Sequence, residues 1–191
     1  MRKLGLSFAA AFIVFSALLA FRPSKRVSAD NPSIVGTWIV TVTVNTPSGA
    51  PPFVFTDLIA FNSGGTLTAT STAFNAHTSE NPFLPAPLVV DTSDGYGAWK
   101  PMGEESNQFA ATFRRFLLAG ANTSTTLYGS FFPGQNIGVD NVEAVATLHT
   151  GEGGDTLTGP FTTQFVNLSG QVAFAGSGTF TATRFKIKPL S

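Results

Sequence analysis

The stretch GTWIVTVTV, residues 36–44, decides the fold class, because its side chains alternate between apolar and polar with almost no exception. Alternation with a period of two is typical of a β-strand with one buried face. The predicted buried face begins at Trp38 and continues through the valines, and the threonines lie on the opposite face. The indole, with Gly36 two positions before it, opens the first predicted strand.

Similar segments rich in Val, Thr and Phe recur along the chain, separated by clusters of Gly, Pro, Asn and Ser. The glycines of Asn62-Ser63-Gly64-Gly65 predict the clearest hairpin turn. Residues 73–94, which include three prolines, predict a long irregular loop of the kind that serves as a lid or stays disordered. The predicted strands are residues 35–45, 53–61, 66–72, 95–100, 107–118, 137–149, 156–166 and 172–185, with 125–131 as an alternative ninth.

Consecutive hairpins of this kind leave two exposed edges unless the sheet closes on itself. Closure at eight strands gives an interior that holds either side chains or one small ligand. Gly176 and Gly178 in the last predicted strand would permit the bending that closure requires. The sequence therefore predicts an all-β fold: a single antiparallel up-and-down β-barrel of about eight strands.

Residues 1–29 have the pattern of a signal peptide, with a basic start at Met1-Arg2-Lys3, an apolar run over 4–21 and small residues before the predicted cleavage after Ala29. We therefore expect two parts, a signal peptide at 1–29 and a barrel domain at 30–191. The expected location is secreted or periplasmic. An uncleaved membrane anchor is the less favoured alternative, since the apolar run is close to the shortest length that spans a bilayer.

Charge and cysteine content exclude several classes of function. Five of the eleven basic residues lie in the signal segment, so residues 30–191 keep six basic and eleven acidic residues, a formal charge of −5. A chain with this balance and no basic cluster is not expected to bind nucleic acid, or a membrane after cleavage. The sequence contains no cysteine, so disulfides and thiolate metal sites are excluded.

In a closed barrel the first and last strands are neighbours, so Arg184 would lie over the Trp38 ring, a contact that contributes about 0.5 to 2 kcal/mol. Gly36-x-Trp38 with this late arginine resembles the lipocalin/calycin signature. The resemblance implies a calycin-like barrel, with Trp38 and Arg184 as structural residues. The chain departs from many lipocalins in its lack of cysteines, of the usual mid-barrel motifs and of a long helix before the last strand.

The chain also resembles small exported bacterial proteins of unassigned function that share three segments. These are a Gly-Thr-Trp first strand, here Gly36-Thr37-Trp38, a Gly-x-Gly-x-Trp middle strand, and a Gly-Thr-Phe-Thr-Ala-Thr end; in this sequence the last two cover residues 95–99 and 178–183. This resemblance supports the fold and implies no activity. The alternative is a β-sandwich in which Trp38 is an ordinary core residue, because sandwiches produce the same strand spacing.

The common catalytic signatures are absent: there is no Gly-x-Ser-x-Gly elbow, phosphate loop or Gly-x-Gly-x-x-Gly. The two histidines, His77 and His149, are not at metal-ligand spacing, so we predict no metal site and no cofactor. Residues 151–157, GEGGDTL, faintly resemble calcium-binding glycine-rich repeats. A single copy favours a hairpin turn instead.

Asp57 is the most informative polar residue, because alternation places it on the same face as Phe53, Phe55, Ile59 and Phe61. A carboxyl group among phenyl rings needs a partner or stays protonated. Arg115, on the face of Phe109 and Phe113, is the predicted partner. This pair would fix the polar end of a ligand; the alternatives are a β-bulge that turns Asp57 outward, or a pair that is merely satisfied within the core.

We predict that the lumen binds a small hydrophobic ligand, with residues 73–94 as a lid and no catalytic residue. One alternative is an enzyme, an isomerase or cyclase of the allene oxide cyclase kind, in which Asp57, Arg115 and Tyr96 would act on the substrate. Another is a filled barrel that serves as a structural or interaction module through its threonine-rich outer face. The predicted ligand-binding residues are Phe55, Asp57, Ile59, Phe109, Phe113, Arg115, Phe165 and Phe174.

Overall fold

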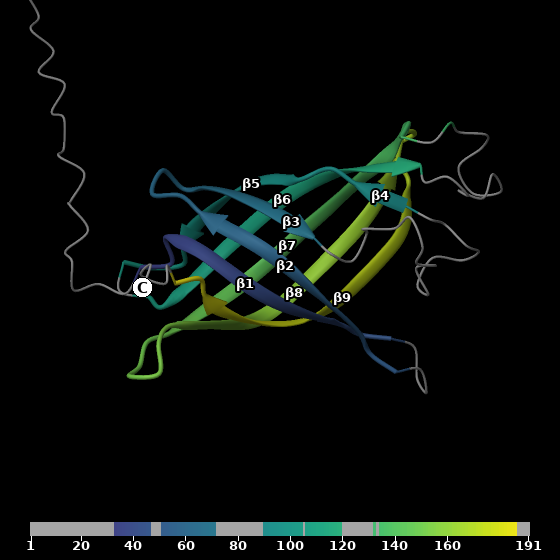
Figure 1. Cartoon of the computed structure of the whole chain (residues 1–191). Helices are drawn as coiled ribbons and strands as arrows, with labels where there is room; N and C mark the ends of the chain where they lie inside the picture. Colours follow the sequence, from purple (N-terminus) through teal and green to yellow (C-terminus); the bar gives the residue numbers. More distant parts are fainter. Residues whose placement is uncertain are drawn as a thin grey trace, which may run out of the picture. The chain divides into compact units, whose positions relative to one another are not determined.

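Nine β-strands account for the regular structure of the chain in a computed structural model that describes residues 33–46, 51–71, 90–104, 106–119, 132 and 134–186 (Figure 1). Among these residues no helix is long and apolar enough to cross a membrane. The strands are β1 (Gly36–Val44), β2 (Phe53–Phe61), β3 (Thr66–Ser71), β4 (Val90–Thr92), β5 (Gly95–Pro101), β6 (Gln108–Ala119), β7 (Asn136–His149), β8 (Thr156–Asn167) and β9 (Val172–Arg184).

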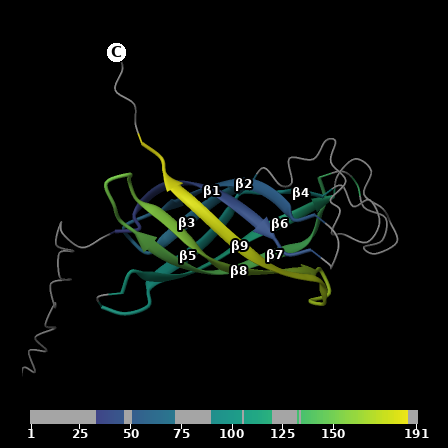
Figure 2. The same cartoon turned by 90° about the horizontal axis from the view of Figure 1, so that it is seen from below.

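Eight of the strands close into one antiparallel barrel. The hydrogen-bonded order β6-β5-β3-β2-β1-β9-β8-β7 returns to its start, because β7 also pairs with β6. Closure joins the first strand to the last: β1 pairs with β9 from Trp38 opposite Arg184 to Val44 opposite Gly178, and Figure 2 shows the two strands side by side. The predicted up-and-down barrel is confirmed, and the β-sandwich alternative is wrong, since all nine strands belong to one sheet.

The observed strands begin and end within about two residues of the predicted ones, but β4 was not predicted. It lies in the segment 73–94 that the sequence predicts as irregular, and it pairs with β6 from Val90 opposite Ala119 to Thr92 opposite Leu117. The strand β5 then pairs with β6 from Tyr96 opposite Arg114, in a register that differs by one residue from that of β4. A β-bulge at 93–94 thus separates β4 from β5 and hides the alternation that would have revealed β4.

Several sequence predictions fall outside the described residues. They are the signal peptide at 1–29, the lid interpretation for residues 73–89, the alternative strand at 125–131 and His77. The predicted turn at 151–154 is confirmed, since Gly154 N donates a hydrogen bond to Gly151 O over 2.9 Å.

Trp38 and Arg184 close one end of the barrel as predicted. The Trp38 side chain is fully buried, and its indole Nε1 donates to Ile34 O over 2.8 Å. The Arg184 guanidinium carbon lies 4.3 Å from the ring centroid. Arg184 also donates from Nη1 to Val35 O over 2.5 Å and from Nη2 to Ser33 O over 2.6 Å. The last strand therefore fastens the segment before the first strand across this end.

Gly36 is required by this arrangement in two ways. Its φ of +134° is a conformation that residues with a side chain rarely adopt. A Cβ atom at this position would also lie 2.7 Å from Arg184 Nη1. The glycine two residues before the tryptophan thus lets the arginine approach the chain, which explains why the first strand opens with this pair.

Candidate functional site

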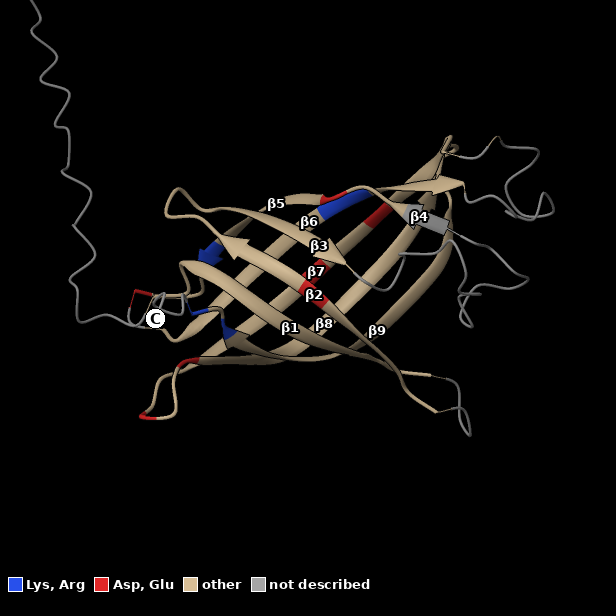
Figure 3. Cartoon of the chain, in the orientation of Figure 1, with Lys and Arg blue, Asp and Glu red and all other residues tan. Residues whose placement is uncertain are grey.

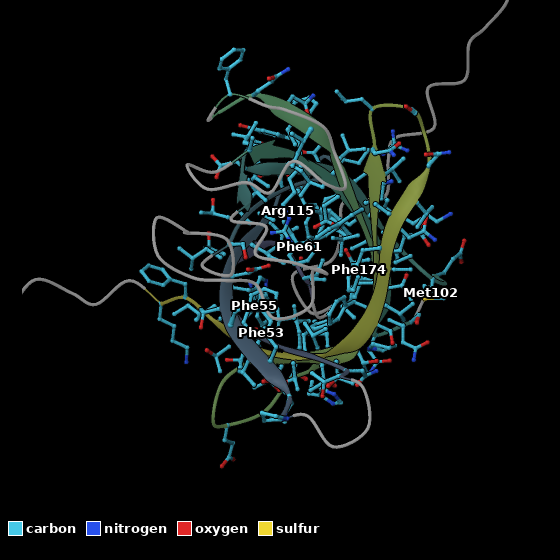
Figure 4. All side chains as sticks on the ribbon, turned by 90° about the vertical axis from the view of Figure 1, so that its right-hand side faces the viewer. Phe53, Phe55, Phe61, Met102, Arg115 and Phe174 are labelled. Atoms are coloured by element: carbon cyan, nitrogen blue, oxygen red, sulfur yellow. The ribbon has the colours of Figure 1, made fainter. Side chains whose placement is uncertain are left out.

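The inward positions of the strands surround a cavity inside the barrel. Their alternation directs one residue in two toward the lumen, so phenylalanines and small aliphatic side chains supply most of its wall. Figure 4 looks along the barrel and shows Phe53, Phe55, Phe61, Arg115 and Phe174 within the ring of strands. The lining residues are Val40, Val42, Val44, Phe53, Phe55, Asp57, Ile59, Phe61, Leu67, Ala111, Phe113, Arg115, Asp140, Val142, Ala144, Ala146, Leu157, Phe161, Thr163, Phe165, Phe174 and Phe180.

The cavity is small and partly open to solvent. The volume available to water-sized molecules is about 90 Å³, and all space between the lining atoms, including its open part, is about 970 Å³. Trp38 and Ile34 are fully buried at one end. Phe53 and Phe174 line the cavity at the opposite end, where they pack against the buried residues Leu117 and Ile137.

Charged side chains are sparse on the strands (Figure 3), yet three of them line this cavity. Arg115 and Asp140 form a buried ion pair in which Arg115 Nε donates to Asp140 Oδ2 over 2.8 Å. The Thr163 hydroxyl donates to the second carboxylate oxygen, Asp140 Oδ1. Asp140 is fully buried, so these partners supply the hydrogen bonds that a carboxylate in an apolar wall requires.

Asp57 is the third charged residue that lines the cavity, and one of its two carboxyl oxygens makes no hydrogen bond. It is 4% exposed, it receives a hydrogen bond from the Ser71 side chain opposite it on β3, and its Oδ1 atom makes no hydrogen bond. Burial raises the pKa of the Asp57 carboxyl above its usual 3.8, and the charge of Asp140 raises it further. The charge of Arg115 and the Ser71 hydrogen bond oppose this shift without cancelling it.

The arrangement gives an apolar lumen with one polar spot in its wall. Asp140 accepts hydrogen bonds from Arg115 Nε and from the Thr163 hydroxyl. Two buried atoms of the lining residues, Asp57 Oδ1 and Arg115 Nη1, make no hydrogen bond among the described residues, and the Asp57 oxygen belongs to a carboxyl group whose pKa burial raises. A carboxyl group of this kind can donate a hydrogen bond when protonated and accept one when ionised. It can therefore orient a bound molecule that has one polar group.

Seven of the eight predicted ligand-binding residues line the cavity; the exception is Phe109. The Phe109 ring packs against Trp99 at a centroid distance of 5.8 Å, inside the core and away from the cavity. Asp57 is buried, so the alternative of a β-bulge that turns it outward is wrong. Tyr96 is 66% exposed on the outer face of β5 and does not join Asp57 and Arg115.

Sequence reasoning missed Asp140 and Thr163. Arg115 forms an ion pair with Asp140, which lies opposite it on β7, and its charge also acts on Asp57, the partner predicted from the sequence. Alternation on β7 carried the signal, because Asp140 shares a face with Val142, which is buried. Its pairing with Arg115 depends on the register of β6 against β7, which the sequence does not display.

No metal site is formed by the described residues, since none of their histidines and carboxylates gather in groups of three or more. His149 is exposed, with its Nε2 atom 2.9 Å from the Thr158 hydroxyl. Comparison of the chain with protein-family models, with curated proteins and with solved structures finds no match. The closed eight-stranded antiparallel barrel is consistent with the calycin-like resemblance, and the site must be interpreted from its own geometry.

Proposed function

We propose that the barrel binds a small, mostly apolar molecule in its lumen and holds the polar group of this molecule at Asp57. The observation that carries the proposal is the Oδ1 atom of Asp57, which is buried at the wall of an apolar cavity and makes no hydrogen bond. Small-molecule sites typically combine such an apolar lining with a few polar groups that fix orientation. A buried polar atom without a partner is otherwise unfavourable, and a bound ligand supplies the partner.

The cavity size favours slender ligands. An engineered protein cavity of about 150 Å³ holds one benzene molecule, and the volume available in this lumen is about 90 Å³. A short unbranched chain fits this space better than a fused ring system. The existence of the cavity also favours ligand binding over the filled-barrel alternative.

The enzyme alternative has weaker support. Asp57 and Arg115 line the cavity, but Tyr96, the third residue that this alternative uses, lies on the outer face. The signal-like segment at residues 1–29 motivates the further proposal that the protein acts outside the cytoplasm.

The test is a titration of the purified protein with benzene, 1-hexanol and hexylamine, followed by the NMR signals of the lumen methyl groups of Val40, Val42 and Val142. We expect saturable shifts of these signals. Ala144→Leu places a larger side chain in the lumen and should weaken binding, whereas Ala98→Leu makes the same change on the exposed face of β5 and should not. The proposal is refuted if no compound shifts the lumen signals, or if Ala144→Leu leaves every affinity unchanged.

A further inference from the structure

We propose that the polar group of the ligand is a primary ammonium, which the Asp57 carboxylate binds inside the lumen. This inference rests on the proposed function, since it specifies the chemistry of the molecule that the cavity holds.

The described lining residues include two carboxylates, Asp57 and Asp140, and one guanidinium, Arg115. Arg115 forms its ion pair with Asp140, whose other oxygen accepts from Thr163. When both carboxylates are ionised, the cluster has a formal charge of −1 in an apolar wall. Unmatched charge in such surroundings is strongly unfavourable, so an occupant that supplies a positive charge stabilises the ionised form of the cluster.

A primary ammonium balances the charge of the ionised cluster and supplies a hydrogen-bond donor for Asp57. It can donate to Asp57 Oδ1, the atom that has no hydrogen bond. It also brings the cluster to neutrality, with two positive groups for two carboxylates. The surrounding phenyl rings, among them Phe55, Phe165 and Phe174, offer ring faces that attract cations and apolar surface that suits an alkyl chain.

Without an occupant, burial favours the protonated form of Asp57 by raising its pKa. The charged groups that face Asp57 across the lumen are Arg115 on β6 and Asp140 on β7, and the lining residues from β1, β3, β8 and β9 are uncharged. An ammonium that binds the carboxylate must therefore displace its proton: R–NH₃⁺ and Asp57–COOH give the R–NH₃⁺···⁻OOC–Asp57 pair and one H⁺ released to solvent.

The sign of the pH dependence separates an ammonium from a neutral ligand. The affinity for an amine should rise with pH until Asp57 is already ionised in the empty barrel, because burial raises the pKa of this carboxyl. A ketone or an alcohol that accepts a hydrogen bond from the protonated carboxyl should instead bind more weakly as pH rises.

The experiment is calorimetric titration of the purified protein with hexylamine, 1-hexanol and 2-hexanone between pH 5 and pH 8, in buffers of different ionisation enthalpy. We expect hexylamine to bind more tightly than the other two by about tenfold or more at pH 8, as a charge-assisted hydrogen bond implies. Proton release should accompany amine binding at the lower pH values. Asp57→Asn should remove both effects, and Glu143→Gln, which deletes an exposed carboxylate on β7, should remove neither.

The possible results are distinct. If 1-hexanol or 2-hexanone binds with an affinity that falls as pH rises while hexylamine binds no better, the ammonium inference is wrong and the proposed function stands. If no six-carbon compound binds, both are wrong. If Asp57→Asn does not fold, the proton exchange of the wild-type protein on binding hexylamine still tests the inference. Proton release supports it, and proton uptake or no exchange overturns it.

Discussion

Replacing Arg184 with alanine removes the contacts that fasten the closed end of the barrel, and we expect it to lower the free energy of unfolding by about 3 kcal/mol. The cation–π contact with Trp38 accounts for about 1 kcal/mol of this. Each hydrogen bond from the charged side chain to the carbonyls of Ser33 and Val35 accounts for about 1 kcal/mol, after allowance for its partial exposure. The ion pair with Asp155 is partly exposed to solvent and adds little.

The assay is urea unfolding followed by tryptophan fluorescence, with the melting temperature as a second measure. For a domain of this size a loss of about 3 kcal/mol corresponds to a decrease of about 6 to 12 °C. Arg114→Ala is the matched control, because Arg114 is exposed on the outer face of β6, and a surface change of this kind alters stability by about 0.5 kcal/mol or less.

Arg184→Lys makes the test more specific. Lysine keeps the positive charge but cannot place three separate nitrogen donors against Val35, Ser33 and Asp155, as Arg184 does. We therefore expect Arg184→Lys to lose most of the stability that Arg184→Ala loses. The reasoning is refuted if Arg184→Ala behaves like Arg114→Ala, or if the lysine variant is as stable as the wild type.

Three further changes follow from the buried charges and from the strand entry. Asp57→Asn should gain stability relative to the wild type as pH rises from about 3.8 to the raised folded pKa of Asp57, because a carboxyl whose folded pKa is raised contributes stability at low pH and loses it across this range. Urea unfolding at several pH values measures this. Asp140→Leu should cost about 3 to 5 kcal/mol in denaturant unfolding because it leaves the Arg115 charge buried, whereas the double change with Arg115→Met should be close to neutral. Gly36→Ala should lower stability by about 1 to 3 kcal/mol because of its positive φ, and Gly151→Ala, at an open and exposed position, should leave the melting temperature unchanged.

The strands and their closure could be predicted from sequence because each rests on a local pattern. Residues 36–44 alternate, and residues 62–65 form the turn between β2 and β3 with Gly65 at a φ of +79°. Closure follows from these elements by elimination, since an open meander of eight strands exposes its edges. The strand β4 could not be found in this way, because it has only three residues and its register against β6 differs by one residue from that of β5.

The site shows a different limit. Alternation on β2 correctly predicts that Asp57 faces the phenylalanines of the lumen, and alternation on β6 predicts the same for Arg115. The partner of Arg115 is a matter of register: β6 and β7 align so that Asp140 lies directly opposite. A one-residue slip in that alignment would turn the carboxylate to the outer face, so no inspection of single strands assigns the pair. Phe109 is buried, as its predicted inward face implies, but it packs against Trp99 and does not line the cavity.

The charged residues at the closed end and those in the lumen differ in whether their polar atoms have hydrogen-bond partners. This difference distinguishes residues that stabilise the fold from residues that are suited to binding a ligand. At the closed end, Nε, Nη1 and Nη2 of Arg184 each donate to a partner, so this cluster is explained by the stability of the fold. In the lumen, burial disfavours the ionised form of Asp57, and Oδ1 makes no hydrogen bond. A neutral residue of the same shape at position 57 should therefore make the barrel more stable at neutral pH. A side chain that makes the fold less stable than its neutral counterpart is not explained by folding, and binding sites are where proteins tolerate such groups.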